Sequence, residues 1–404
     1  MIKRERYISR IRPFIDTELV KVLTGIRRSG KSVMLELIKE ELLTNGVDPA
    51  SIISINFEDL SFSHLQNSLS LYEEICKRSR EIGKKVYLFF DEIQEVEGWE
   101  KCINSFRVAL DCDIYITGSN AKLLSGELAT YLGGRYVEFV IYPFSFEEFV
   151  ELYKSVVPNE TIEQCFKKYL SLGGMPYLSN ISFSPDATKQ YLQDVFASVL
   201  LKDIVKRNQV RDVDFLERII EYVMTNIGTP LSASSLSRYL KNEGRTVAVE
   251  TILNYIKYCC DSFLFYRVKR EDVRGKQVLA SNEKFYIADH GMREAVFGGN
   301  MRDINQTLEN IVYMELVRRG YLVTAGKVGD KEIDFVCKKN NDKIYVQVAY
   351  LLASNETIQR EFGVYKQVQD NYPKYVVSLD EFGMSRDGIK HINIREFLLM
   401  EKWN

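Results

Sequence analysis

Eight residues near the N-terminus have the types and the spacing of a phosphate-binding loop. Residues 25–32 read Gly-Ile-Arg-Arg-Ser-Gly-Lys-Ser and fit the pattern G-x-x-x-x-G-K-[ST]. The glycines let the backbone curl so that its N–H groups point at phosphate oxygens. The lysine would reach the β- and γ-phosphates of ATP, and the last hydroxyl would ligate Mg²⁺. The pattern predicts a site for ATP and Mg²⁺ built from Gly25, Arg28, Ser29, Gly30, Lys31 and Ser32.

An acidic pair follows a later apolar run. Asp91 and Glu92 come directly after Val86-Tyr-Leu-Phe-Phe90. The carboxyl end of a buried parallel strand is where sheets of this kind bind ligands. Asp91 would hold the Mg²⁺ that Ser32 also contacts, and Glu92 would orient and polarise the attacking water. Taken alone, the pair could also be a polar strand end that caps a turn.

Another apolar run, at 113–117, ends in Thr117-Gly-Ser-Asn. A polar group at this strand end would lie beside the γ-phosphate and sense its presence. Ser119 and Asn120 are both candidates for that role. For either residue alone, a helix N-cap is an equally good interpretation.

Arg135 follows a Gly-Gly pair just before the fifth apolar run. A guanidinium at this point could stabilise transition-state charge on a neighbouring subunit's nucleotide, or on its own. A solvated surface arginine is the alternative that the sequence leaves open.

The elements that must position these groups alternate in type. Strand-like runs at 19–23, 52–57, 86–91, 113–117 and 137–141 are separated by helical segments, the first from Lys31 to about Asn45. This βαβ rhythm predicts a parallel α/β sheet. The first helix would add its N-terminal dipole to the phosphate site.

Length and composition restrict the class of protein. The 404 residues favour two or three domains, and 46% hydrophobic with 27% charged residues is typical of soluble globular chains. No run approaches the ~18 apolar residues of a membrane span, and the start lacks the apolar region of a signal peptide. We therefore expect a cytoplasmic protein with no membrane partner. The formal net charge of −2 argues against a protein that coats nucleic acid.

Five segments together carry a family resemblance: GIRRSGKS, LFFDEIQ, ITGSNAKLL, LGGRYVEFVIYPFSFEEF and YLSLGGMPYL. The chain resembles, over nearly its whole length, the AAA-type P-loop ATPases of bacteria and archaea that carry a conserved C-terminal domain of unknown function. The resemblance implies an ATPase core at 1–143 and a helical lid at 144–211. It also implies that Arg135 is the arginine finger.

Residues 212–300 change in character. A short helix, a turn, a longer helix from about Val247 and a strand pair follow one another in winged-helix order. The longer helix, TVAVETILNYIKY, has few side chains that read base edges. Binding of DNA and binding of a protein partner both remain open.

Residues 301–404 resemble the PD-(D/E)xK nuclease-like fold. An active member would use a helix glutamate, a strand aspartate and an E-x-K on the next strand. Glu309 and Asp334 match the first two, but Gln347 and Ala349 stand where the acid and the lysine belong. The sequence therefore predicts a domain that does not cut nucleic acid.

The sequence as a whole predicts an α/β P-loop ATPase core with a parallel sheet and a helical lid, followed by these two modules. The predicted function is Mg²⁺-dependent ATP hydrolysis coupled to a C-terminal effector or partner-binding part. The alternative is a nucleotide-gated switch, or a DNA-associated binding protein, with little turnover. The partner is an unidentified protein or DNA, and a homo-oligomer is compatible with the trans role of Arg135.

Overall fold

The computed structural model describes residues 2–121, 132–242, 248–273, 275, 277–299 and 302–403. The chain forms two compact units. The first comprises Met1–Tyr142 with Asp261–Phe263, and the second comprises Pro143–Cys260 with Leu264–Asn404. Among the described residues, no helix combines the length and the apolar composition that a membrane span needs.

The first unit contains a five-stranded sheet, in the order β2-β3-β4-β1-β5. All its pairings are parallel. The strands are β1 (Val20–Thr24), β2 (Ile52–Asn56), β3 (Val86–Asp91), β4 (Cys112–Thr117) and β5 (Tyr136–Val140). The predicted parallel α/β sheet is confirmed, and β4 lies between β1 and β3.

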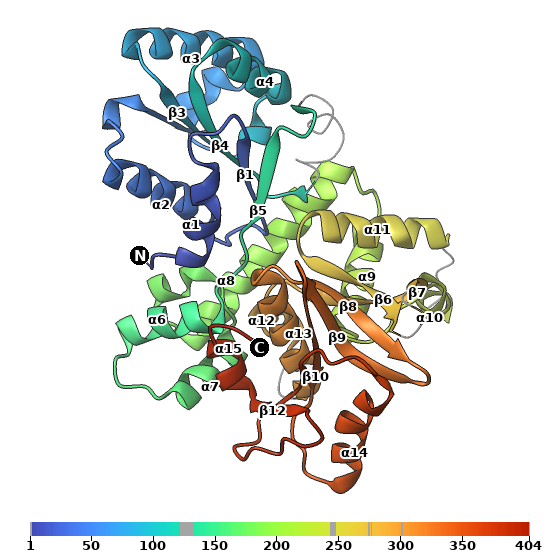
Figure 1. The fold of residues 1–404 in the computed structure, drawn as a ribbon. Helices are drawn as coiled ribbons and strands as arrows, with labels where there is room; N and C mark the ends of the chain where they lie inside the picture. The colour runs from blue at the N-terminus through green and yellow to red at the C-terminus, as the bar shows by residue number, and fades with distance from the viewer. Residues whose placement is uncertain are drawn as a thin grey trace. The chain divides into compact units, whose positions relative to one another are not determined.

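Helices cover both faces of this sheet (Figure 1). Side chains of α1 (Glu5–Ile11) and α2 (Lys31–Thr44) share one apolar cluster with Phe89 and Tyr115. Side chains of α3 (Ser68–Ile82) and α4 (Trp99–Ala109) share the other with Leu88, Phe90 and Ile116. Successive strand residues point to opposite faces, so strands buried on both faces are continuously apolar. This is why these runs could be recognised in the sequence.

The second unit begins with helices. Capping boxes at Ser145 with Glu148 and at Thr161 with Gln164 begin its first two. The helices of this part are α6 (Phe146–Val156), α7 (Ile162–Leu172), α8 (Pro185–Ser198) with a π-helical continuation at Val199–Lys206, α9 (Val213–Thr225), α10 (Ala233–Asn242) and α11 (Val249–Asp261).

A mixed seven-stranded sheet, in the order β12-β11-β10-β9-β8-β6-β7, completes the second unit. Its strands are β6 (Phe265–Asp272), β7 (Gln277–Ile287), β8 (Leu322–Val328), β9 (Lys331–Lys339), β10 (Asp342–Val348), β11 (Lys374–Ser378) and β12 (Lys390–Asn393). Its helices are α12 (His290–Phe297), α13 (Ile304–Arg318), α14 (Asn355–Gly363) and α15 (Ile394–Leu399). Because β6 pairs in parallel with β8, the strand pair expected within 212–300 shares one sheet with the strands of 301–404.

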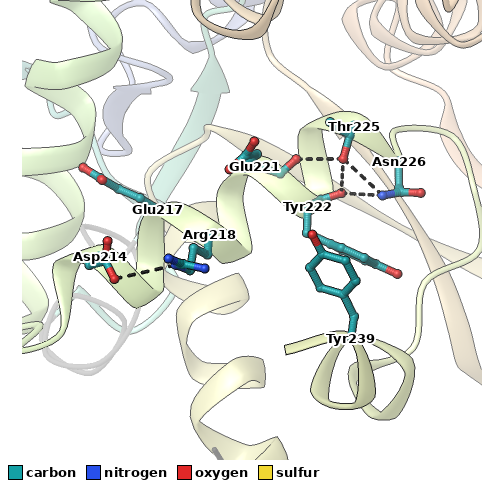
Figure 2. A pocket seen from close by; sticks show the side chains of 8 residues that line it. All are labelled: Asp214, Glu217, Arg218, Glu221, Tyr222, Thr225, Asn226 and Tyr239. Carbon is teal, nitrogen blue, oxygen red and sulfur yellow. Dashed lines mark hydrogen bonds and ion pairs between the residues drawn. The ribbon is translucent and has the colours of Figure 1, made fainter. Parts of the chain in front are cut away.

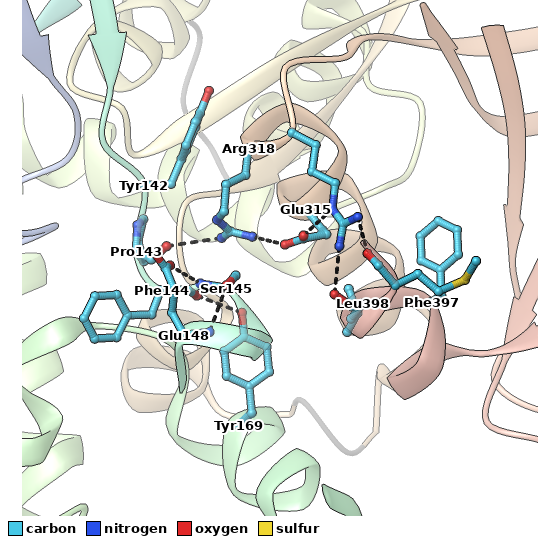
Figure 3. A network of polar contacts seen from close by, with 12 residues as sticks. Tyr142, Pro143, Phe144, Ser145, Glu148, Tyr169, Glu315, Arg318, Phe397 and Leu398 are labelled. Atoms are coloured by element: carbon cyan, nitrogen blue, oxygen red, sulfur yellow. Dashed lines mark hydrogen bonds and ion pairs between the residues drawn. The ribbon is translucent and has the colours of Figure 1, made fainter. Parts of the chain in front are cut away.

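A buried ion cluster on α13 holds the first residue of this unit (Figure 3). Glu315 accepts from Arg318 at 2.5 Å and from Arg319 at 2.6 Å. Arg318 also donates to the carbonyl of Pro143 at 3.2 Å. The next residue, Phe144, donates its N–H to Gly174 at 2.7 Å. The residues that leave β5 are thus fixed by two separate elements of the second unit.

Candidate functional site

The loop between β1 and α2 has the backbone that a phosphate cradle requires. Gly25 and Gly30 have φ values of 136° and 97°, and Arg28 has 68°. A Cβ on Gly25 would lie 2.2 Å from the carbonyl oxygen of Ile141, so no other residue fits there. Gly30 is the N-cap of α2 and has no side chain to cap the first amides of this helix. Those amides and the helix dipole together favour an anion.

Two side chains of the loop are placed for phosphate. Lys31 is buried and donates to the carbonyls of Gly25 at 3.1 Å and Ile26 at 3.2 Å. Ser29 is fully buried, and its hydroxyl has no hydrogen-bond partner in the described structure. A buried hydroxyl without a partner is costly, and a phosphate oxygen would satisfy it. The loop therefore fits a nucleotide phosphate.

The ends of β3 and β4 meet through one hydroxyl that our sequence argument missed. Thr117 donates to a carboxylate oxygen of Asp91 at 2.5 Å. The same oxygen of Thr117 accepts from the N–H of Glu92 at 2.8 Å. Thr117 is fully buried and Asp91 is 7% exposed. One threonine thus fixes the carboxylate of Asp91 and the backbone of Glu92.

Glu92 has a strained backbone, with φ at 53° in the left-handed region. Its carboxylate accepts a hydrogen bond from the side-chain amide of Gln94. The side chain is half-buried at the carboxyl end of β3. It is therefore positioned beside Asp91 at the edge where sheets of this type bind ligands.

Ser119 and Asn120 follow β4, whose neighbours in the sheet are β1 and β3. Because the carboxyl ends of parallel strands lie at one edge, both residues are between the phosphate loop and the acidic pair. Both are buried, with exposed fractions of 0% and 2%. The structure brings both to the site, and the choice of γ-phosphate sensor stays open.

Arg135 is not at this edge of the sheet. It precedes β5, and its carbonyl accepts from the N–H of Val20 at 3.1 Å, where β1 begins. Strands β1 and β5 then pair in register from Val20 with Tyr136 to Thr24 with Val140. At a rise of about 3.3 Å per residue, this separates Arg135 from the phosphate loop by more than about 13 Å. The exposed guanidinium is therefore remote from the nucleotide site of its own chain.

Only two of the predicted magnesium ligands come from the protein, Ser32 and Asp91. No group of three His, Cys, Asp or Glu side chains with metal-binding geometry occurs among the described residues. Mg²⁺ in nucleotide sites keeps several waters and takes other ligands from the phosphates, so a hydroxyl and one carboxylate are enough. Ser32 is exposed at the start of α2, and the pair fits an ion bound together with ATP.

A second charged cluster lies in the second unit, where nuclease-like chemistry was considered. Lys284 of β7 contacts Glu332 at 2.7 Å, Glu309 at 3.0 Å and Asp334 at 3.8 Å. Tyr286 donates to Glu309 at 2.5 Å. Burial opposes the charge of Lys284, but the three carboxylates outweigh it and raise its pKa. Burial and the charge of Glu309 raise the pKa of Asp334.

The position of Lys284 could not be deduced from residues 301–404 alone, because β7 precedes them in the chain. Gln347 accepts from the N–H of Asp334 at 3.1 Å and donates to Glu361 at 2.9 Å. The amide of Gln347 is thus used in the hydrogen-bond network of this cluster. A lysine does reach the two acidic residues that match the nuclease pattern, although not from the expected position.

A pocket of about 680 Å³ opens between α9 and α10 (Figure 2). The rings of Tyr222 and Tyr239 are 4.9 Å apart within it. The pocket carries more carboxylates than cations, with Arg218 opposite Asp214 at 3.6 Å. Its lining consists of Asp214, Glu217, Arg218, Glu221, Tyr222, Thr225, Asn226 and Tyr239.

Comparison with protein families identifies two regions. Residues 17–150 match an AAA domain. Residues 163–303 match a domain of unknown function, DUF8612. The first match contains every residue of the nucleotide site described above.

Two relatives extend over most of the chain. An uncharacterized protein of Haemophilus influenzae is 37% identical over 400 residues, which are 99% of this chain and 99% of that protein. An uncharacterized protein of Methanocaldococcus jannaschii is 28% identical over 388 residues, covering 93% of this chain and 84% of that protein.

Solved structures show only distant likeness. The Aeropyrum pernix ORC2 protein in ADPNP–ADP complexes has a TM-score of 0.37 and 11% identity, over 78% of this chain and 93% of that one. AMPPCP-bound DnaA from Aquifex aeolicus has a TM-score of 0.29 and 17% identity, over 50% of this chain and 62% of that one. Likeness at this level carries no functional argument, and the site must be interpreted from its own geometry.

Proposed function

The chain belongs to the same family as the Haemophilus influenzae protein and has an AAA domain at 17–150, and on this basis we propose that it is a Mg²⁺-dependent ATPase. The observation that carries the proposal is the junction of β3 and β4, where Thr117 fixes Asp91 and Glu92 together. A loop that only bound phosphate would not need this second, strained element at the same sheet edge.

In this proposal the loop amides and Lys31 bind the phosphates. Lys31 exchanges its two backbone carbonyls for the β- and γ-phosphate oxygens, so its charge is held ready by weak partners. Ser32 and Asp91 hold Mg²⁺, which when bound neutralises charge that develops on the phosphates. Glu92 releases the amide of Gln94 and aligns the attacking water. Ser119 or Asn120 contacts the γ-phosphate.

Arg135 would complete the site of a neighbouring subunit. The guanidinium is exposed and lies on the sheet edge opposite its own phosphate loop. An arginine supplied in trans stabilises charge on the transferred phosphoryl group. This role makes a homo-oligomer the active form.

The test separates binding from turnover. Glu92→Gln should keep ATP affinity within about tenfold and slow steady-state phosphate release by on the order of 10² or more. Lys31→Ala should weaken ATP binding itself. Phosphate release at the wild-type rate by Glu92→Gln would remove Glu92 from its role. Wild-type protein that binds ATP without releasing phosphate would favour a nucleotide-gated switch.

We propose that the second unit comprises a lid at 144–211, a winged-helix-like module at 212–300 and a nuclease-like part at 301–404. The module has three helices and a strand pair, and Leu231 bridges to Glu283 of β7. The outer face of α11 exposes 40% of Val249 and 53% of Leu253, which read no bases. The carboxylates of the pocket on α9 repel phosphates. Both features favour a protein partner over DNA.

The nuclease-like part is proposed to be inactive. Lys284 neutralises the carboxylates that would otherwise take a metal ion. Incubation with supercoiled, linear and single-stranded DNA, each with Mg²⁺ or Mn²⁺, should give no cleavage. Cleavage that is lost in Asp334→Ala but kept in Lys31→Ala would show a working nuclease in which Lys284 is the missing lysine.

A further inference from the structure

An arginine outside the matched AAA domain reaches the phosphate loop. Arg4 lies before α1, and the AAA match begins at residue 17. Its guanidinium donates to the carbonyl of Ser29 at 3.2 Å and to the carbonyl of Tyr142 at 2.8 Å. It is 4% exposed and lies over the ring of Tyr7, 4.5 Å from the ring centroid. These contacts all lie within the first unit.

The contact to Ser29 determines which way one peptide group of the loop points. In a trans peptide the C=O of one residue and the N–H of the next point in opposite directions. With the Ser29 carbonyl turned toward Arg4, the N–H of Gly30 must point away from Arg4. Gly30 begins α2, whose first amides form the anion site.

The contact to Tyr142 gives the loop a fixed support. Tyr142 follows β5, and its N–H donates to the hydroxyl of Tyr7 at 3.2 Å. The neighbouring carbonyl of Ile141 is the group that leaves no room for a Cβ on Gly25. The end of β5 therefore touches one side of the loop directly and holds the other side through Arg4.

We propose that Arg4 is a positioning residue for the phosphate loop, which bridges the loop to the end of β5 and holds the Gly30 amide toward the phosphates. This inference rests on the proposed nucleotide site. It assigns a role in phosphate binding to the segment before the AAA domain. The buried guanidinium also adds positive potential behind the loop, which favours a polyanion.

The test compares ligands with and without phosphates. ADP and adenosine compete with a fluorescent ATP analogue for wild-type protein, Arg4→Met, Arg4→Lys and a control, Arg12→Met. Arg12 pairs with Glu5 and Glu41 at the surface, so its loss removes an arginine of the same segment without touching the loop. Failure of wild-type protein to bind the analogue would refute the nucleotide site itself, independently of Arg4.

Arg4→Met should weaken ADP binding by about tenfold or more, the effect of one lost charge-assisted hydrogen bond. Adenosine should compete within about twofold of wild type, and Arg12→Met should match wild type for both ligands. Arg4→Lys, which can keep one carbonyl contact, should lie between and serves as the test if Arg4→Met does not fold. Unchanged ADP affinity, or an equal loss for adenosine, would overturn the proposal.

Discussion

Thr117→Val is the substitution that tests the catalytic geometry most directly. Valine has nearly the shape of threonine but lacks the hydroxyl, so the fully buried side chain keeps its packing. The change removes the donor to Asp91 at 2.5 Å and the acceptor for the Glu92 N–H at 2.8 Å. The carboxylate would lose its orientation, and the strained residue after it would lose its support.

The magnitude follows from the first of these bonds. A hydrogen bond to a charged group contributes about 1.5–3 kcal/mol, and about 1.4 kcal/mol corresponds to tenfold in rate. Steady-state phosphate release should therefore fall by about tenfold to about 150-fold. The buried N–H of Glu92, left without its acceptor, should also lower the thermal midpoint.

The assay is phosphate release at saturating ATP over a series of Mg²⁺ concentrations. Thr117→Val should also need more Mg²⁺ for half-maximal rate, because Asp91 is less well oriented. Thr117→Ser keeps the hydroxyl and should stay within a few-fold of wild type. Equal rates for wild type and Thr117→Val, or equal losses for the valine and serine variants, would refute the reasoning.

Three other predictions concern separate parts of the chain. Mixing Arg135→Ala with Lys31→Ala should restore some phosphate release, because mixed interfaces regain a complete site; no restoration at any ratio, with oligomers confirmed, would count against trans action. Lys284→Met should lower the thermal midpoint, and Mn²⁺ should then raise it by filling the carboxylate cluster; an equal rise in wild type would contradict this. Burial lowers the pKa of His391, so below pH of about 6.5 the unfolded chain binds a proton that the folded chain does not, and stability falls with pH. His391→Gln should flatten that decline in a thermal-unfolding series, whereas the exposed His64→Gln should not.

Much of the nucleotide site was predictable because its parts are local in sequence. The loop and the helix after it fall within a short segment, and a buried parallel strand is a continuous apolar run that ends in a polar residue. Asp91 and Glu92 could be found in this way. Their spatial relation to the loop followed from the βαβ rhythm, since parallel strands place their carboxyl ends at one edge.

The residues that sequence reasoning missed act across long separations in the chain. Arg4 contacts residues 25 and 138 positions away, and Thr117 is 26 positions from Asp91. Lys284 reaches Glu309 only because β7 joins the last sheet through β6 and β8. No periodicity marks such contacts, and an arginine, threonine or lysine at these positions resembles an ordinary surface or strand residue.

The strained backbone at the acidic pair explains why Thr117 must serve two residues at once. A left-handed φ in a residue other than glycine costs on the order of 1–3 kcal/mol and persists only where the surroundings hold it. Glu92, at 53°, is held by its N–H bond to Thr117, and the same hydroxyl donates to Asp91. A shift of the Asp91 carboxylate toward Mg²⁺ therefore moves the hydroxyl that supports the Glu92 backbone. Metal binding and the alignment of the attacking water are coupled through this one side chain.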